Sequence, residues 1–315
     1  MTDPDGKAEM AAYIIRRILM LIPTLIAITM ISFFILQVVP GDPARAMAGI
    51  DAEEKDVQAI RTQLGLDRPI HVQYGIFLKN VVRGNFGESI RSRDDVIKQI
   101  WPRFLNTLKL AFASITLSVI IGMIAGVMAA TRKNTGADYA TMGLILLGIS
   151  APTFWTGLLL ILVFSVYAGW FPAGGTGGFL NLVLPAITLA APSAAVTARM
   201  TRSSMLEVLQ MEYIKTARAK GQKEIKVIFK HALKNALIPT ITVVGMQFGY
   251  LMGGAVLVET VFTWPGLGWL LVDAIFAKDY PVVQAGVVFF AAGFVLVNLA
   301  VDILYTYVDP RITYE

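Results

Sequence analysis

Long apolar runs alternate with short polar segments along this 315-residue chain. A helix needs about 20 apolar residues to cross a bilayer, and most of the runs reach that length. Prolines interrupt several runs, which a membrane helix tolerates when neighbouring helices satisfy the freed backbone groups. The pattern predicts an all-α integral membrane protein with six transmembrane helices. These are Tyr13–Val39, Leu105–Ala130, Tyr139–Tyr167, Leu180–Ala198, Ala236–Val258 and Val282–Tyr305.

The first apolar run has a second interpretation, as a cleaved signal peptide preceded by Arg16 and Arg17. Its length argues against that, because it is about twice as long as the apolar region of a signal peptide. The small-residue triplet Ala46–Ala48 resembles a cleavage site but lies beyond the Pro40–Pro43 segment, far from the apolar run. We therefore expect a retained first transmembrane helix.

The distribution of Lys and Arg predicts the orientation. Short loops rich in these residues stay on the cytoplasmic side of a membrane, whereas long segments translocate largely regardless of charge. The segment Pro40–Arg103 carries ten basic and nine acidic residues and is expected on the opposite side. Both termini are therefore expected in the cytoplasm. The basic positions on their side are Arg16, Arg17, Arg132, Lys133, Arg199–Asn235 and Arg311.

The expected organisation has two parts. Residues 1–103 form an N-terminal tail, the first transmembrane helix and the extracytoplasmic segment, and residues 104–315 form a five-helix core. Helical spacing and a following Gly65 predict a short helix over Glu53–Leu64, and a second is expected from Asp67 to Lys79. This segment is either a small cap over an outer mouth or a solvated loop.

Composition agrees with a membrane protein and removes several function classes. Only 16% of residues are charged, against about 25% in soluble domains. The sequence pI near 9.3 does not indicate nucleic acid, because the positive charge lies beside membrane helices, where topology explains it. The chain has no cysteine, and His71 and His231 are isolated, so no metal site is predicted.

Motifs for nucleotide binding or intramembrane chemistry are absent from the sequence. No GxxxxGK[ST] segment occurs that would cradle phosphates. The centres of the apolar runs carry almost no ionisable side chains, whereas ion-driven carriers usually need them there. A carrier acting alone and an intramembrane enzyme are therefore disfavoured, and the energy for any transport must come from outside the chain.

Small residues recur at four-residue spacing in two of the predicted helices. Gly122 and Gly126 form one pair, and Gly245, Gly249 and Gly253 form a ladder. Such spacing lets helix backbones approach closely within a membrane. Ordinary helix packing explains each pair, and a helix that slides against a partner is the alternative for the ladder.

The polar segment Arg199–Asn235 stands between two apolar runs and is strongly basic. It contains nine Lys and Arg residues against three acids, an excess larger than the net charge of +5 of the whole chain. Two helices are expected, Ser203–Lys220 and Lys223–Asn235, meeting at Gly221, which can adopt the positive φ that ends a helix. The lysines of the second helix suit either lipid or protein. The small residues before Gly221 favour a protein partner.

At this segment the sequence resembles a known family. Thr216–Gly221 followed by His231–Pro239 is similar to the cytoplasmic coupling loop of ABC-importer permeases, most closely the B-type subunits of the dipeptide, oligopeptide, nickel and glutathione importers. Lys215 stands where the general pattern of that loop has Glu. Further matching stretches are Pro40–Pro43, Gly84–Ser89, Glu259–Phe262, Pro265–Gly268 and Asp279–Pro281.

The resemblance implies a type I ABC-importer permease fold in a bacterial cytoplasmic (inner) membrane. It also implies three kinds of partner: a second homologous permease in a heterodimer, two cytoplasmic ATPase subunits and an extracytoplasmic solute-binding protein. Membrane lipid is the further partner that the apolar and basic segments indicate. The chain itself would be non-catalytic and would bind no cofactor, with ATP and Mg²⁺ used by the ATPases. The implied contact with the ATPase consists of Lys215, Thr216, Ala217, Arg218, Ala219, Lys220 and Gly221.

The substrate is the least determined expectation. Di- and oligopeptides are favoured, and nickel and glutathione remain alternatives, because selection rests mainly with the binding protein. Two polar residues within apolar runs, Gln247 and Asn298, are candidates for lining the pathway. Each is also suited to hydrogen bonding between helices.

Overall fold

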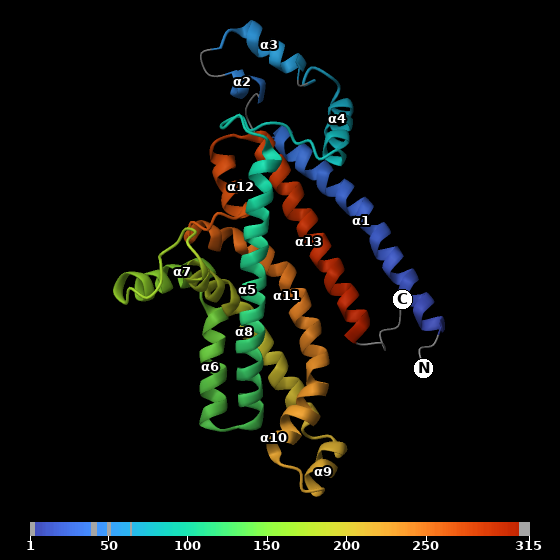
Figure 1. Cartoon of the computed structure of the whole chain (residues 1–315), viewed down its shortest axis with the longest axis vertical. Helices are drawn as coiled ribbons and strands as arrows, with labels where there is room; N and C mark the ends of the chain where they lie inside the picture. The colour runs from blue at the N-terminus through green and yellow to red at the C-terminus, as the bar shows by residue number, and fades with distance from the viewer. Residues whose placement is uncertain (1–3, 39–42, 49–51, 64, 309–315) are drawn as a thin grey trace. The chain divides into compact units, whose positions relative to one another are not determined.

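The computed structural model describes residues 4–38, 43–48, 52–63 and 65–308, and almost all of them are helical (Figure 1). The only β-structure in these ranges is a single bridge between Glu88 and Asp95. The helices are α1 Pro4–Val38, α2 Pro43–Ala48, α3 Glu54–Gln63, α4 Ile70–Val82, α5 Val96–Thr131, α6 Gly136–Ser150, α7 Thr153–Leu160, η1 Ile161–Tyr167, α8 Phe179–Val208, α9 Glu212–Ala219, α10 Glu224–Lys226, η2 Val227–Ala232, α11 Leu233–Val261, α12 Leu267–Phe276 and α13 Tyr280–Val308; η1 and η2 are π-helical.

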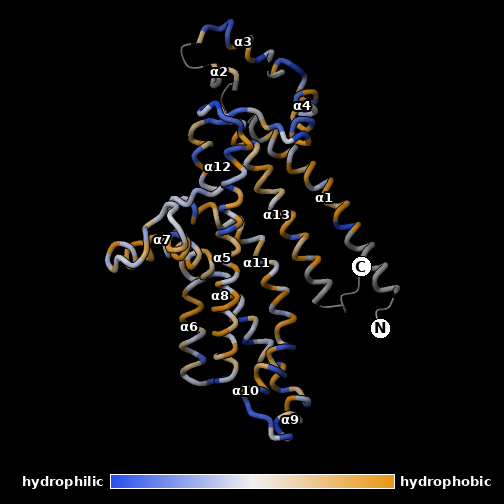
Figure 2. The backbone as a smooth tube through the Cα atoms, viewed as in Figure 1, coloured by the Kyte–Doolittle hydropathy of each residue, from blue (hydrophilic) through white to orange (hydrophobic). Residues whose placement is uncertain are grey.

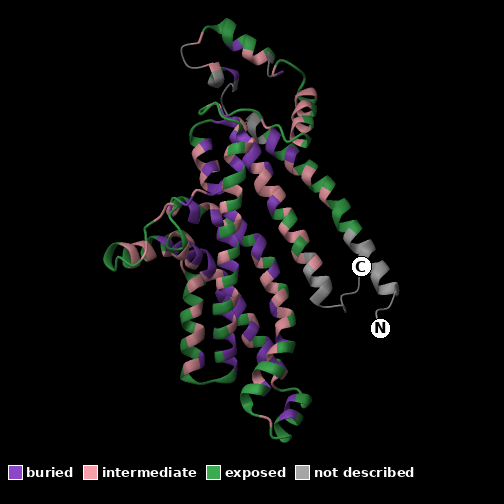
Figure 3. Ribbon diagram, in the orientation of Figure 1, coloured by how far each residue is buried: buried purple, intermediate pink, exposed green. Residues whose placement is uncertain are grey.

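The chain divides into two compact units. Of the described residues, unit 1 contains 4–10, Thr107–Trp264 and 296–308, and unit 2 contains those within Ala11–Asn106 and Pro265–Val295. Within unit 1, α8 packs against α6, α7 and α11. Buried residues are concentrated along α8 (Figure 3), and hydrophobic residues continue along α5, α6 and α8 (Figure 2). Helix α8 is therefore the central element of unit 1.

Within the described part of the chain, five helices are long and apolar enough to cross a membrane. The third predicted helix, Tyr139–Tyr167, is not one of them, because it is broken into Gly136–Ser150 and Thr153–Tyr167 with a bend of 108°. The run predicted as the third transmembrane helix is thus interrupted at Pro152, and a sixth crossing exists if the bent pair acts as one. Ala151 (φ −103°, ψ 141°) and Pro152 (φ −57°, ψ 135°) are both extended. A proline disfavours the helical conformation of the residue before it, which explains the break.

The Gly122 and Gly126 pair packs α5 directly against α8. A Cβ atom at Gly126 would lie 2.6 Å from Cβ of Thr201 and 2.7 Å from the carbonyl oxygen of Ala198. A Cβ at Gly122 would meet Thr197 at 2.6 Å. The predicted close helix packing is confirmed at this pair.

The ladder of Gly245, Gly249 and Gly253 in α11 is only partly a packing surface. Gly245 and Gly249 are buried, but Gly253 is exposed, and no heavy atom would lie within 4 Å of a Cβ there. Each four-residue step turns a helix by about 40° beyond a full circle, so the third glycine points about 80° around the axis from the first. Gly254 instead faces Leu189 of α8, at 3.2 Å from its Cδ1.

Unit 2 contains the two short helices expected after the first apolar run. Helices α3 and α4 agree with the predicted ranges to within a few residues, and Gly65 has a φ of +69° between them. Phe33 of α1 packs against Tyr74 and Phe77 of α4, with ring centroids 5.6 and 5.8 Å apart. The segment is therefore attached to the first transmembrane helix by aromatic contacts.

A buried carboxylate fixes the loop between α4 and α5. Asp279 is 4% exposed and accepts hydrogen bonds from the hydroxyl of Ser89 and from the backbone amides of Ile90 at 3.1 Å and Arg91 at 3.4 Å. Arg91 also forms an exposed ion pair with Asp273 of α12 at 3.0 Å. The Asp279 carboxylate thus holds three consecutive residues of the loop against the start of α13.

We expect Asp279→Ala to release this loop. Each hydrogen bond to a charged group contributes about 1.5–3 kcal/mol, so the substitution should destabilise the loop by at least about 2 kcal/mol. Limited proteolysis of the purified protein should then cut within residues 83–95, while the wild type resists. Asp273→Ala, which removes only the exposed ion pair, is the control and should leave the cleavage rate unchanged.

Candidate functional site

The first half of the basic segment differs from its predicted form. Residues 203–208 continue α8, the chain turns at Leu209–Met211, and a separate helix α9 follows. The single helix Ser203–Lys220 is therefore wrong. In an unbroken helix, Ile214 would lie six positions beyond Val208, about 240° around the axis and so on another face. The turn allows both residues to enter one apolar cluster.

The second half is helical, as predicted, but it does not end at Asn235. Helix α10 continues through η2 into α11, so that Glu224–Val261 forms one apolar candidate span. Pro239 lies inside α11 and does not open it. The basic segment and the following membrane helix are one continuous element.

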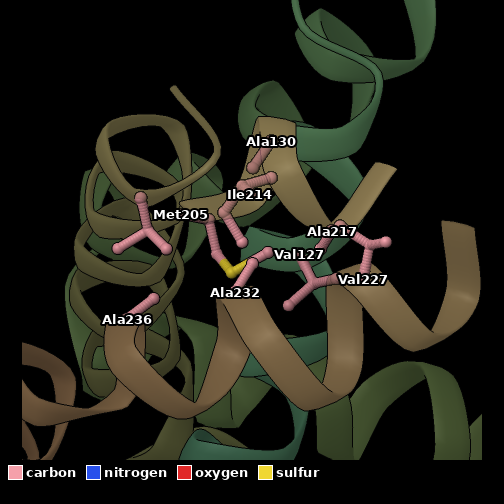
Figure 4. Packing of buried hydrophobic residues seen from close by; sticks show 9 residues of the cluster. Val127, Ala130, Met205, Ile214, Ala217, Val227, Ala232 and Ala236 are labelled. Carbon is pink, nitrogen blue, oxygen red and sulfur yellow. The ribbon is translucent and has the colours of Figure 1, made fainter. Parts of the chain in front are cut away.

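An apolar cluster, here called the junction cluster, carries α9 (Figure 4). Ile214 is fully buried and Ala217 is 7% exposed, and both belong to α9. Their partners come from the ends of α5 and α8 and from the start of the η2–α11 element, so α9 is fixed to three helices of unit 1. The members are Val127, Ala130, Met205, Val208, Ile214, Ala217, Val227, Ala232 and Ala236.

The remaining residues of the predicted contact face outward. We call them the coupling surface: Lys215, Thr216, Arg218, Ala219, Lys220 and Gly221, all exposed. Gly221 has a φ of +72°, which confirms its expected conformation, and nothing lies within 4 Å of a Cβ placed on it. Ala217 is not part of this surface, because its side chain is buried in the junction cluster.

Part of the positive charge of this region is already paired within the chain. Lys215 contacts Glu212 at 2.7 Å. The Arg218 guanidinium donates two hydrogen bonds to Glu224, at 3.1 and 2.6 Å, which raise the pKa of Arg218 above its ordinary value. Both pairs are solvent-exposed and contribute little stability. Among the described residues, no ion pair involves the other lysines of the segment: Lys220, Lys223, Lys226, Lys230 and Lys234.

Polar side chains hold the loop that follows α9. The Nε2 atom of His231 and the Oε1 atom of Gln222 are hydrogen-bonded at 2.9 Å, and Asn235 donates to the hydroxyl of Tyr213 at 2.6 Å. His231 is half-buried and bonded. These bonds fix both ends of the coupling surface to the η2–α11 element.

The two pathway candidates are in different environments. Gln247 accepts a hydrogen bond from the hydroxyl of Ser193 at 3.4 Å, which links α11 to α8. Asn298 is half-buried in α13, and its side chain has no hydrogen bond with any described residue. No hydrogen bond joins Gln247 to Asn298 in the described ranges, and a shared role in lining a pathway stays a prediction.

One ion pair near the coupling surface was not foreseen from the sequence. Arg202 of α8 donates to Asp138 of α6 at 2.8 and 2.7 Å. The position of Asp138 has a local sequence pattern, because a threonine followed three positions later by an acid is typical of a helix N-terminus. Thr135 and Asp138 follow this pattern. Arg202, the partner of Asp138, lies 64 positions away along the chain. The described residues contain no group of three or more metal-binding side chains.

The sequence matches known transport proteins over nearly its whole length. Residues 118–314 match the family described as binding-protein-dependent transport system inner membrane component, and residues 10–111 match the N-terminal part of such membrane components. The glutathione transport system permease protein GsiC of Escherichia coli strain K12 is 46% identical over 306 residues, which cover 97% of this chain and 100% of GsiC. GsiC of Salmonella choleraesuis strain SC-B67 gives the same identity and coverage.

A solved structure has a related fold. An amino acid ABC transporter, crystallised with histidines, superposes with a TM-score of 0.51 at 17% sequence identity. The superposition covers 67% of this chain and 92% of that one. At this identity the similarity concerns the fold alone.

Proposed function

The chain belongs to the family of binding-protein-dependent transport system inner membrane components, and we propose that it forms one half of the translocation pathway of an ATP-driven peptide importer. It is an ABC-importer permease of the dipeptide, oligopeptide and glutathione type, with the type I permease fold and several membrane-spanning helices. The expected family is confirmed. Inner-membrane location follows from the family.

The coupling surface is the observation that supports the mechanism best. It is exposed, basic at Lys220 and mounted on α9, which the junction cluster fixes to α5, α8 and α11. A displacement of α9 can reach the membrane helices only if α9 is packed firmly against them. In our proposal, ATPase subunits bind this surface from the cytoplasm, bind and hydrolyse ATP with Mg²⁺, and move α9 together with the helices behind it.

The remaining assembly follows from this arrangement. A second, homologous permease completes the pathway, two ATPase subunits supply energy, and a solute-binding protein delivers substrate on the extracytoplasmic side. In our proposal the coupling surface faces the ATPases, and both chain termini also lie in the cytoplasm. The chain performs no covalent chemistry in this proposal.

We propose small peptides as the substrate class, with glutathione as the first member to test. The glutathione permeases match this chain over their full length, and glutathione is itself a tripeptide. Di- and oligopeptides are the other members of the class. Nickel import by the same kind of assembly is the competing proposal.

An uptake measurement in a strain lacking this chain tests the substrate class. Labelled glutathione and a labelled dipeptide are supplied with and without the chain on a plasmid, and unlabelled glutathione, dipeptides, longer peptides and Ni²⁺ are added as competitors. We expect chain-dependent uptake of at least one peptide that other peptides inhibit. Chain-dependent uptake of Ni²⁺ that no peptide inhibits would overturn the proposal.

A further inference from the structure

The Asp138–Arg202 ion pair is more buried than the pairs on the coupling surface. The Asp138 side chain is 2% exposed and that of Arg202 is 28% exposed, whereas the exposures in the Arg218–Glu224 pair are 43% and 55%. The Nε atom of Arg202 donates to Oδ1 of Asp138, and a terminal nitrogen donates to Oδ2. Two parallel bonds of this kind fix the orientation of both groups as well as their distance.

Asp138 is also bound to the turn that precedes its own helix. Its Oδ2 atom accepts a hydrogen bond from the backbone amide of Asn134 at 3.0 Å, and its own amide donates to the Thr135 hydroxyl at 3.4 Å. Asn134 adopts a φ of +59°. A single carboxylate therefore joins the α5–α6 turn and the first turn of α6 to Arg202 near the end of α8.

Arg202 lies immediately beside the elements that carry the coupling surface. Thr201 packs on Gly126 of α5, and Met205, one helical turn further along α8, belongs to the junction cluster. Arg202 and Met205 belong to the same stretch of α8, so this stretch connects the junction cluster, which holds α9, with the Asp138 contact to α6.

Helix α6 leads from this pair to the 108° bend at Pro152. Near the bend, a Cβ at Gly148 would lie 2.9 Å from the carbonyl oxygen of Ala191, so α6 also touches α8 at its far end. Among the described residues, the only hydrogen bonds between α6 and α8 are those of Asp138 with Arg202.

We propose that Asp138 and Arg202 are positioning residues of the transport cycle, which keep α6 and the bend at Pro152 moving with α8 and the coupling surface. The proposal rests on the proposed function. Burying a carboxylate with its cation is a weak way to stabilise a protein, because desolvation offsets much of the attraction. A fixed, two-bond connection at the end of a moving helix instead transmits displacement in a defined direction.

The test uses the complete transporter, with this chain, the second permease, the ATPases and the binding protein reconstituted in proteoliposomes. ATP hydrolysis and uptake of the transported peptide are measured in the same sample. Arg202→Lys keeps the charge and removes the two-bond geometry. We expect assembly and ATP hydrolysis to remain, and the uptake per ATP hydrolysed to fall by about tenfold, a typical coupling between distant sites.

Arg91→Lys is the matched control, because the side chain of Arg91 forms a single exposed hydrogen bond with the described residues, to Asp273. Its uptake per ATP should equal that of the wild type. If Arg202→Lys prevents assembly, the double variant Asp138→Asn with Arg202→Gln removes both charges together and should show the same loss of ratio.

The outcomes separate the alternatives. An unchanged uptake per ATP in Arg202→Lys, or in the double variant where that is the one that assembles, overturns the proposal. A parallel fall of hydrolysis and uptake at constant ratio also overturns it, because it indicates a structural role only. If the wild-type transporter itself shows no ATP-dependent peptide uptake, that result contradicts the proposed function. It does not contradict the role of the Asp138–Arg202 pair.

Discussion

Replacing Gly221 by aspartate is expected to uncouple ATP hydrolysis from uptake and leave membrane insertion intact. Gly221 is exposed with a φ of +72°, and an added side chain would meet no atom of this chain within 4 Å. The left-handed conformation costs an L-residue about 1–2 kcal/mol, and aspartate is among the residues that adopt it most readily. The protein should therefore fold. In our proposal the ATPase occupies the open space beside Gly221, so an aspartate side chain would obstruct its binding.

Gly169 offers a matched control for the backbone effect. It lies in the loop after η1, is exposed, has a φ of +66° and has no atom within 4 Å of a Cβ. Gly169→Asp should therefore insert and transport like the wild type. Both variants are compared for chain abundance in membranes, ATP hydrolysis, peptide uptake and co-purification of ATPase subunits. A correctly inserted Gly221→Asp chain that transports at the wild-type rate would show that the docking assignment is wrong.

Gly126→Ala is expected to have the largest effect on stability. The new methyl group would lie 2.6 Å from Cβ of Thr201 and 2.7 Å from a backbone oxygen of Ala198, so α5 and α8 must separate. Overpacking of this kind costs about 1–3 kcal/mol, and more where backbone has to move. The purified variant should unfold in detergent at a clearly lower temperature than the wild type, as followed by loss of the monodisperse peak after heating.

The matching substitution is Gly143→Ala in α6, where a Cβ meets nothing within 4 Å. Alanine has a better helix propensity than glycine, so this variant should be as stable as the wild type or slightly more so. Equal unfolding temperatures for the Gly126 and Gly143 variants would contradict the close approach of α5 and α8.

The apolar periodicity predicted the helical fold and most of its long helices, because burial in a membrane leaves few alternatives to a helix. It failed at Tyr139–Tyr167, although Pro152 was visible in the sequence. A proline within a membrane helix produces anything from a slight kink to a full break. Which of these occurs depends on neighbours such as Gly148, whose contact with Ala191 of α8 no local pattern reveals.

The candidate site shows the same division between local and distant information. The positive φ of Gly221 followed from its place at the end of a helix-prone stretch. The burial of Ala217 did not, because it depends on residues of α5 and α8 that are remote in sequence. Charge counting identified Arg202 only as part of a basic segment. Its partner Asp138 lies in the first turn of α6, far away in the sequence, and no spacing rule joins the two.

The π-helical turn η2, Val227–Ala232, bears on how a displacement at the coupling surface travels along α11. A π turn bonds residue i to i+5 and so contains one residue more than an α turn needs. Moving that extra residue along the helix rotates only the residues that it passes, each by about 100° about the helix axis. A displacement that moves it would therefore reorient side chains within the element from Glu224 to Val261 while the two ends of the element keep their relative orientation.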